Sequence, residues 1–447
     1  MVELGPVGGT CVNYGCTPTK TMVASAEIAH LARRAPEFGI HAGPVQVDMA
    51  RLRQRKRDMV KTWREGSEKR LSYGVDLIHG EASFLPAEPQ SPKSTPKSIL
   101  VRLNQGGELR LTADLVVIDT GLTVNPPSIP GLAPGPSQVP FLDIVSIMEL
   151  DHLPEHLLIL GGGHIGLEFG QMFRRFGSRV TIVQRSAQLL PQEDEDIAQE
   201  TAKLLREDGI EILLSTNAHS VAASPGGIQL TVSSDPTGQV TPATSRTLEG
   251  SHLLVATGTP PASTSPQPAS PPTTAASSRS TSTSRPAYPA STPPATSTAA
   301  PPSPTSPTTT TAYSRPIYAA VLTPPSAKDR LVPYCVFIDP QLGRVGLSER
   351  QAAAQGIPVR VARLPMTSVA RSMETSQASG FMKALVDPAT QQILGAAVLG
   401  QDGGEIMSML QIAMMGKLPY PVLENAVLAH PTLAESLNNL FGHFDGD

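Results

Sequence analysis

The chain has 447 residues, more than one hydrophobic core usually supports, so we expect several domains. Its 39 acidic and 35 basic residues leave a net charge of −4, and without a basic field we expect neither nucleic acid nor a membrane as a partner. No apolar run is long enough to cross a bilayer and no secretory signal opens the chain, so we expect a cytoplasmic protein.

The first motif is GGTCVNYGCTPTK, which holds Cys11 and Cys16, two of only three cysteines. Three cysteines exclude a disulfide-stapled scaffold. Gly15 and the following Thr-Pro pair allow a distorted first helical turn in which the two thiols could bridge. A dithiol at a helix N-terminus suits reversible disulfide exchange, and two merely structural cysteines are the alternative. No histidine or second cysteine pair has ligand spacing, so we expect no metal site.

After this motif, segments whose apolar residues have the spacing of a helix alternate with segments that have the spacing of a strand. Residues 48–71 predict a charged amphipathic helix, whose basic run we interpret as a solvated face. Strands are predicted at 115–121, 156–163, 179–185 and 252–258. This alternation indicates α/β units in the first half of the chain.

A glycine-rich turn follows the second of these strands. Gly161, Gly163 and Gly166 have the G-x-G-x-x-G spacing, and the helix after them would direct its N-terminus at a pyrophosphate. The strand before, the helix after and a second strand about 20 residues on supply the required context, so we expect a dinucleotide site. That second strand ends in Gln184 and Arg185 instead of an acidic residue, which favours NADP over NAD. An exposed strand-end arginine is the alternative.

Proline is the unusual residue of the composition, with 44 in the chain and 15 of them between Pro260 and Pro316. This segment consists almost wholly of Pro, Ser, Thr and Ala. Acidic residues are missing from 250 to 328 and glycine from 259 to 342, so the usual turn chemistry is absent. We predict disorder over about 262–312.

The last hundred residues predict a separate α+β unit, with a strand pair over 381–400. Cys335 precedes it on an apolar strand and is interpreted as a buried core thiol. Near the C-terminus, LAHPTLAE places His430 five residues before Glu435. A carboxylate in that relation can hold one imidazole tautomer and suits proton exchange with a thiol.

The motifs GGTCVNYGCTPTK and HPTLAE together resemble the signatures of the pyridine nucleotide-disulfide oxidoreductases, the flavoprotein family of glutathione reductase, dihydrolipoamide dehydrogenase and mercuric reductase. The resemblance implies that Cys11 exchanges with the substrate and that Cys16 faces the flavin. It also implies that Lys20 lies near the flavin and pairs with Glu168 of the nucleotide domain.

The resemblance extends to further residues. It implies that the His430–Glu435 pair reaches across a homodimer to the cysteines of the other subunit. His164 stands where relatives often carry an aromatic residue that gates the nicotinamide pocket, with a solvent-facing loop histidine as the alternative. The expected cofactor contacts, for FAD and for NADP or NAD, are Glu3, Gly9, Thr10, Lys20, Thr120, Gly121, Gly161, Gly163, Gly166, Glu168, Gln184, Arg185 and Gly258.

The expected fold class is α/β, with FAD- and NAD(P)-binding Rossmann-like domains and a C-terminal α+β dimerisation domain. The FAD domain would comprise 1–124 and 259–330, the NAD(P) domain 125–258 and the dimerisation domain 331–447. The first glycine-rich FAD segment of the family should precede Cys11, and only ten residues do. The second should lie where the Pro/Ser/Thr segment stands. We hypothesise that this segment is an out-of-frame translation and Met1 an internal start.

The predicted function is a flavin-dependent NAD(P)H:disulfide oxidoreductase that passes electrons from NAD(P)H through FAD to the cysteine pair. A small-molecule disulfide, or a metal- or thiol-bound substrate, would then be reduced. The regions TCVNYGCTPTK and EDEDIAQE look most like mercuric-reductase-like enzymes, whereas the cysteine-free C-terminal LFGHFDGD argues against mercury itself. The alternative is a catalytically silent, dimerising nucleotide-binding remnant with a Pro-rich loop that recruits partners.

Overall fold

The computed structural model describes residues 1–86, 97–121, 127–132, 139–234, 245–257 and 330–446, together with the backbone of 291–292. The chain forms two compact units. Unit 1 comprises Met1–Thr21, Gln54–Asn125 and Thr259–Arg330, and unit 2 comprises Met22–Arg53, Pro126–Gly258 and Leu331–Asp447. Apart from residues 291–292, the segment predicted to be disordered lies outside the described residues. The domain limits predicted above stay predictions.

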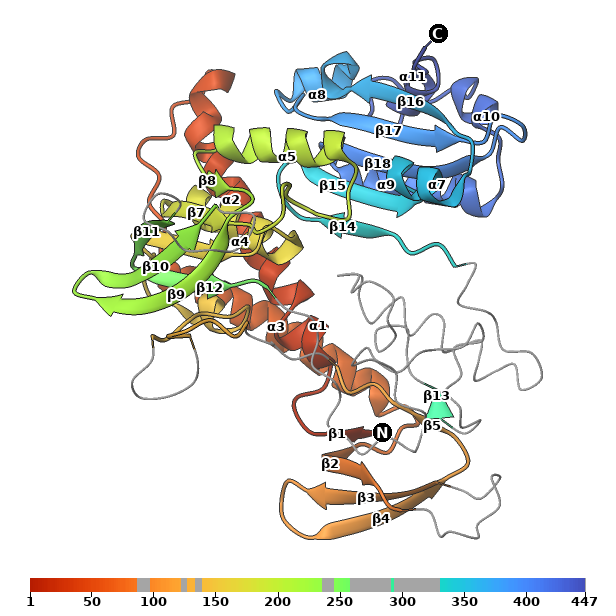
Figure 1. Ribbon diagram of the computed structural model, residues 1–447. Helices are drawn as coiled ribbons and strands as arrows, with labels where there is room; N and C mark the ends of the chain where they lie inside the picture. The colour runs from red at the N-terminus through yellow and green to blue at the C-terminus, as the bar shows by residue number, and fades with distance from the viewer. Residues whose placement is uncertain are drawn as a thin grey trace. The chain divides into compact units, whose positions relative to one another are not determined.

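Unit 1 contains a four-stranded sheet in the order β1-β2-β3-β4 (Figure 1). β1 is parallel to β2, and the other neighbours are antiparallel. The strands are β1 (Val2–Glu3), β2 (Ile78–Phe84), β3 (Lys97–Leu103) and β4 (Glu108–Ala113). The strand predicted over 115–121 shortens to β5 (Val116–Val117), which pairs with β13 (Ser291–Thr292). Leu115 and Val117 are exposed, so this segment has no buried apolar face to extend it.

Three helices connect the cysteine motif to the rest of the chain: α1 (Gly9–Asn13), α2 (Cys16–Arg34) and α3 (Met49–Leu71). The helix predicted over 48–71 is confirmed as α3. Three residues of its basic run are exposed, as predicted, namely Arg51, Arg55 and Arg57, whereas Lys56 is buried. Arg53 donates to the carbonyl of Glu149, and Arg64 donates to the side chain of Asn13 in α1. Part of the basic run therefore satisfies buried or helix-terminal oxygens.

Unit 2 contains a parallel sheet in the order β12-β6-β7-β8. Its strands and helices are β6 (His156–Leu160), α4 (His164–Phe176), β7 (Arg179–Val183), α5 (Glu195–Glu207), β8 (Glu211–Leu213) and β12 (His252–Val255). All five residues of β6 are buried. The predicted strands in this region are confirmed. β6 and β7 end a few residues early because the chain turns toward the next helix at the carboxyl edge, and β12 ends at Val255.

A second, antiparallel sheet covers one side of the parallel one. It has the order β11-β10-β9, and its strands are β9 (Asn217–Ser224), β10 (Gly227–Ser233) and β11 (Ser245–Gly250). Leu230 of β10 packs in one apolar cluster with Leu158 of β6 and Leu253 of β12. The sequence reading did not identify these strands.

The C-terminal part of unit 2 is a five-stranded antiparallel sheet in the order β14-β15-β18-β17-β16 (Figure 1). The strands are β14 (Tyr334–Val336), β15 (Gln341–Gly346), β16 (Arg360–Pro365), β17 (Phe381–Val386) and β18 (Ile393–Gly400). The helices are α7 (Glu349–Gln355), α8 (Ala370–Glu374), α9 (Gly403–Met415), α10 (Tyr420–Glu424) and α11 (Ser436–Leu440). The α+β unit and the strand pair over 381–400 are confirmed.

Cys335 differs from its prediction. It lies on β14 as expected, but its side chain is only half-buried. Its Sγ contacts the edge of α9, because a Cβ on Gly404 would lie 3.0 Å from it. The interpretation as a buried core thiol is therefore wrong.

Candidate active site

The two cysteines lie on successive helices. Cys11 lies inside the five-residue α1, and Cys16 is the first residue of α2. The helical conformation is interrupted between them, at Tyr14 and Gly15. A Cβ on Gly15 would lie 3.1 Å from the carbonyl oxygen of Thr10, so glycine permits this tight return. The break lets residues five apart approach each other, as the sequence predicts.

The two thiols interact in the reduced state. Neither cysteine forms a disulfide, and both are half-buried. A hydrogen bond with the Cys16 thiol raises the pKa of Cys11, and burial and the charge of Cys16 add to the effect, while the charge of Lys20 opposes it. Cys11 therefore holds its proton while Cys16, at the N-terminus of the 19-residue α2, stands where the helix dipole favours a negative charge. An attack by Cys11 needs a base.

The surroundings of the cysteines suit the ring-bearing end of a flavin. Gly8 and Gly9 both have positive φ, and a Cβ on Gly9 would meet no atom within 4 Å, so open space adjoins the backbone just before Cys11. Lys20 lies one turn further along α2. In the described part of unit 1 no glycine-rich turn opens a helix of several turns. The residues present thus fit the ring end of a flavin, and we assign no residue to its pyrophosphate.

Two predicted flavin contacts lie in unit 1, one at the end of β1 and one three residues after β5. Glu3 ends β1, and its Oε1 accepts a hydrogen bond of 3.1 Å from the backbone N–H of Gly5. Thr120 is exposed and follows Asp119. Burial and the charge of Glu3 raise the pKa of Asp119, so these two carboxylates are close enough to interact. Gly258, the remaining strand-end prediction, lies outside the described residues.

The glycine turn of unit 2 has the geometry of a phosphate-binding loop. A Cβ on Gly166 would lie 2.0 Å from the carbonyl oxygen of Gly161, so helix and turn can pack this closely only with glycine. Gly161 has a φ of 111°, and a Cβ there would clash with the carbonyl oxygen of Ala256. Gly163 caps α4, and a Cβ on it would meet no atom within 4 Å. Space therefore remains at the N-terminus of a 13-residue helix, where a pyrophosphate fits.

The two residues after β7, Gln184 and Arg185, were both predicted to contact the nucleotide, but their side chains have different surroundings. The side chain of Gln184 is buried, and its Oε1 accepts the backbone N–H of Gly162 at 3.1 Å, so this amide braces the glycine turn. Arg185 is exposed. Of the two residues, the guanidinium of Arg185 is the one placed to meet a ligand from the solvent side.

His164 is the first residue of α4, and its ring stacks on Tyr334 with centroids 5.2 Å apart. The hydroxyl of Tyr334 donates to Glu193, and Arg344 lies 3.6 Å from the other carboxylate oxygen of Glu193. Burial raises the pKa of Glu193 to about 6, against the charge of Arg344. Sequence reasoning missed Tyr334, Glu193 and Arg344, because no local spacing links positions 140 to 180 residues apart.

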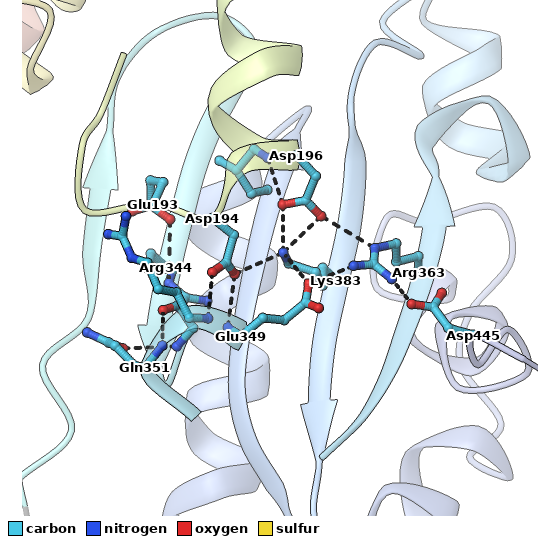
Figure 2. A network of polar contacts seen from close by, with 12 residues as sticks. Glu193, Asp194, Asp196, Arg344, Glu349, Gln351, Arg363, Lys383 and Asp445 are labelled. Atoms are coloured by element: carbon cyan, nitrogen blue, oxygen red, sulfur yellow. Dashed lines mark hydrogen bonds and ion pairs between the residues drawn. The ribbon is translucent and has the colours of Figure 1, made fainter. Parts of the chain in front are cut away.

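A second missed cluster surrounds Lys383 (Figure 2). The side chain of Lys383 is fully buried on β17, and its Nζ lies 2.7–2.9 Å from oxygens of Asp194, Asp196 and Glu349. Burial lowers the pKa of Lys383, but its hydrogen bonds to the three carboxylates outweigh burial and raise it overall. The three carboxylates could hold a metal ion, and Lys383 occupies the position between them.

Glu168 and Lys20, the predicted interdomain pair, belong to unit 2 and unit 1 respectively, so their pairing stays a prediction. Glu168 is buried on α4, and its Oε1 accepts the backbone N–H of Phe337 at 2.9 Å. One carboxylate oxygen of Glu168 is thereby fixed by the segment that follows β14.

His430 and Glu435 form the predicted pair. Nδ1 of His430 lies 2.8 Å from Oε2 and 3.0 Å from Oε1 of Glu435, the residue that precedes α11. Thr432 accepts the backbone N–H of Glu435 and donates to the carbonyl of Ala429, which holds the turn. The imidazole is exposed, and Nδ1 is the ring nitrogen that contacts Glu435. Such a pair can exchange a proton with a thiol.

The chain belongs to the pyridine nucleotide-disulphide oxidoreductase family. The sequence model of that family matches residues 1–273, and the model of the family's dimerisation domain matches residues 332–441. The protein is therefore a pyridine nucleotide-disulfide oxidoreductase, one of a class of FAD-dependent enzymes that use NAD or NADP. Among the described residues, no helix combines the length and the apolar character needed to span a membrane.

Individual relatives agree with this assignment. The "probable pyridine nucleotide-disulfide oxidoreductase RclA" of Escherichia coli strain K12 is 32% identical, over 97% of this chain and 90% of its own. A mercuric reductase of Bacillus cereus is 31% identical over 100% of this chain and 68% of its own. The solved structure of the Cu(II) complex of RclA, a HOCl-induced flavoprotein disulfide reductase, superposes with a TM-score of 0.82 at 30% identity, covering 99% of this chain and 92% of that one.

Proposed function

We propose that the protein uses NADPH to reduce a small-molecule disulfide or a thiol-bound metal ion through the pair Cys11 and Cys16. The observation that carries the proposal is the juxtaposition of these thiols at the start of α2, in a chain that also has a dinucleotide turn. Residues around Gly9, Lys20 and Gly121 would hold the ring of a flavin, which when bound would supply the two-electron redox chemistry that links the nucleotide to the Cys11–Cys16 disulfide. NADPH is favoured by the exposed Arg185 and by the lack of an acidic residue at the end of β7.

The reduced dithiol can act on a disulfide substrate in two exchanges. Deprotonated Cys11 attacks one substrate sulfur, a mixed disulfide forms, and the expelled thiolate takes up a proton. Cys16 then attacks Sγ of Cys11, which releases the second substrate thiol and restores the Cys11–Cys16 disulfide. The cysteine pair is oxidised by two electrons and the substrate is reduced by two.

His430 is the proposed base and acid for these steps. The hydrogen bond with Cys16 keeps the proton on Cys11, so a base must remove it before attack. The Nδ1 of His430 is held by Glu435, which leaves Nε2 to accept that proton and return it to the leaving thiolate. In the proposed homodimer His430 serves the cysteines of the other copy.

The test measures disulfide reduction and the flavin spectrum of the purified protein. We expect a yellow protein in which Cys11→Ser and Cys16→Ser abolish NADPH-dependent disulfide reduction, whereas the control Cys335→Ser retains it. A mixed panel of disulfides, Cu(II) and Hg(II) identifies the acceptor, since relatives carry names of all these kinds. A colourless protein that still binds NADPH would contradict the proposal and favour a silent nucleotide-binding protein.

A further inference from the structure

A closed circuit of contacts surrounds the glycine turn of unit 2. Starting at the turn, the N–H of Gly162 donates to Oε1 of Gln184 at 3.1 Å, and Nε2 of Gln184 donates to the carbonyl of Gln188 at 3.3 Å. Nε2 of Gln188 then donates to the carbonyl of Glu193 at 3.1 Å. The N–H of Leu190 also returns to the carbonyl of Gly162 at 2.9 Å. Residues 188–193 are thus fastened to the turn.

Tyr334 completes this circuit from the other side. Its hydroxyl donates to Glu193, and its ring stacks on His164, which directly follows the turn, at an interplanar angle of 29°. Glu193 is held in turn by Arg344 at 3.6 Å, and both of these side chains are at least 96% buried. The His164 ring therefore stacks on a tyrosine whose hydroxyl is held by the buried Glu193.

The imidazole of His164 stands at the first residue of α4, beside the place where the pyrophosphate of a dinucleotide would bind. A side chain that is already ordered loses less conformational entropy when a ligand packs on it. Because stacking on Tyr334 orders His164 before the nucleotide arrives, Tyr334 can influence binding without touching the ligand itself.

We propose that Tyr334 is a positioning residue of the pyridine-nucleotide site, which fixes the His164 ring as one wall of that site, with Glu193 and Arg344 fixing Tyr334. The proposal rests on the proposed use of NADPH. It assigns a role to three residues that lie outside the glycine motif and belong to β14, β15 and the segment before α5.

The test is direct binding of NADPH, followed by nucleotide fluorescence, with the full-length protein. Tyr334→Leu removes the stack, and we expect affinity to fall about three- to tenfold, the range given by the typical energy of an aromatic pair. Tyr334→Phe keeps the stack and loses the bond to Glu193, so a smaller loss is expected. In steady-state assays KM for NADPH should rise while kcat stays within about twofold.

The role of His164 is isolated by a double-mutant cycle. In a His164→Ala background, Tyr334→Leu should cause no further loss, because the wall is already missing. The matched control is Tyr420→Leu, which removes a ring that packs on Phe441 and Phe444 elsewhere in unit 2 and should leave NADPH affinity unchanged.

The outcomes separate this inference from the proposed function. If the wild type binds NADPH and Tyr334→Leu binds it with the same affinity, the inference is overturned and the proposed function is not. The same holds if Tyr334→Leu still lowers the NADPH affinity in the His164→Ala background. If Tyr334→Leu does not fold, Tyr334→Phe and Glu193→Gln decide by the same measurement, and unaltered affinity in both overturns the inference. A wild-type protein that fails to bind NADPH overturns both proposals.

Discussion

Lys383 acts as the cation of a site built from three carboxylates. Its fully buried ammonium forms ion pairs with Asp194, Asp196 and Glu349, in place of the water that would otherwise solvate these carboxylates. The three acidic residues lie at the starts of α5 and α7. Removing one partner from such a cluster leaves like charges facing each other in a poorly solvated place. We therefore expect Lys383→Met to lower the free energy of unfolding by on the order of 3 kcal/mol, measured by urea denaturation.

The same geometry predicts a rescue by a divalent cation. Ca²⁺ prefers several carboxylate oxygens, and the vacated centre of the cluster offers them within 4.8 Å of one another. Millimolar Ca²⁺ should raise the unfolding midpoint of Lys383→Met and leave that of the wild type almost unchanged. Lys203→Met, which removes an exposed lysine paired with Glu200, is the control and should show neither effect. Equal shifts in all three proteins would refute the interpretation.

Glu193 predicts a pH dependence of stability. Burial raises its folded pKa to about 6, above the ordinary value of 4.5, so the folded state binds the proton more tightly than the unfolded state does. Below about pH 4.5 both states are protonated and there is no penalty. As pH rises through 6 the folded state must carry a buried charge, and stability falls by about 2 kcal/mol.

Glu193→Gln isolates this contribution. The difference in unfolding free energy between wild type and variant should move in favour of the variant by about 2 kcal/mol between pH 4.5 and pH 7. Urea denaturation at four pH values across that interval measures it. A pH-independent difference would show that Arg344 and Tyr334 compensate the buried charge fully.

At the scale of the element, two glycines at the start of α4 should respond differently to substitution by alanine, one by loss of stability and the other by loss of NADPH binding. Gly166→Ala places a Cβ 2.0 Å from the carbonyl oxygen of Gly161 and should destabilise unit 2 by several kcal/mol. Gly163→Ala meets no protein atom within 4 Å, so the fold should tolerate it. Its methyl group would occupy the space kept for a pyrophosphate, and NADPH affinity should fall at least tenfold. Thermal unfolding and NADPH titration of both variants distinguish the two outcomes.

The elements that could be predicted from sequence are those whose signal is local. The parallel strands before and after α4 are apolar runs next to glycine. In α3 and in the hairpin β17–β18, the spacing of apolar residues is that of a helix and of strands respectively. The antiparallel sheet β9-β10-β11 was missed because its strands are only partly buried, so they do not form continuous apolar runs in the sequence. The Lys383 cluster was missed for another reason, since it joins residues up to 189 apart and no motif spans that distance.

The candidate site divides in the same way. Cys11, Cys16, the glycine turn and the pair His430–Glu435 each lie within a few residues of one another, and the structure places each group together as its spacing indicated. The role of Gln184 in bracing the turn, and that of Tyr334 beside His164, depend on side-chain contacts between distant segments. Such contacts have no period or spacing in the sequence.

At the scale of the whole molecule, an apolar surface on α9 points to self-association. One face of this helix is buried against β15 and β18, whereas Met409, Ile412 and Met415 on the other face are 40%, 68% and 68% exposed. These residues follow one another at three-residue spacing and form a continuous stripe. The stripe lies within the segment that matches the family's dimerisation domain, so we propose that a second copy of the chain covers it.

Ile412→Asp tests both the homodimer and the proposed place of His430 in the other subunit. An aspartate at the centre of the stripe would be buried without a partner, so the variant should sediment as a monomer in analytical ultracentrifugation. NADPH binding, which uses one copy only, should persist, whereas disulfide reduction should fall at least a hundredfold because Cys11 loses the base supplied by the other copy. Met373→Asp, at an exposed position of α8, is the control and should remain dimeric and active. A monomeric Ile412→Asp variant with full disulfide reductase activity would place the base within the same chain.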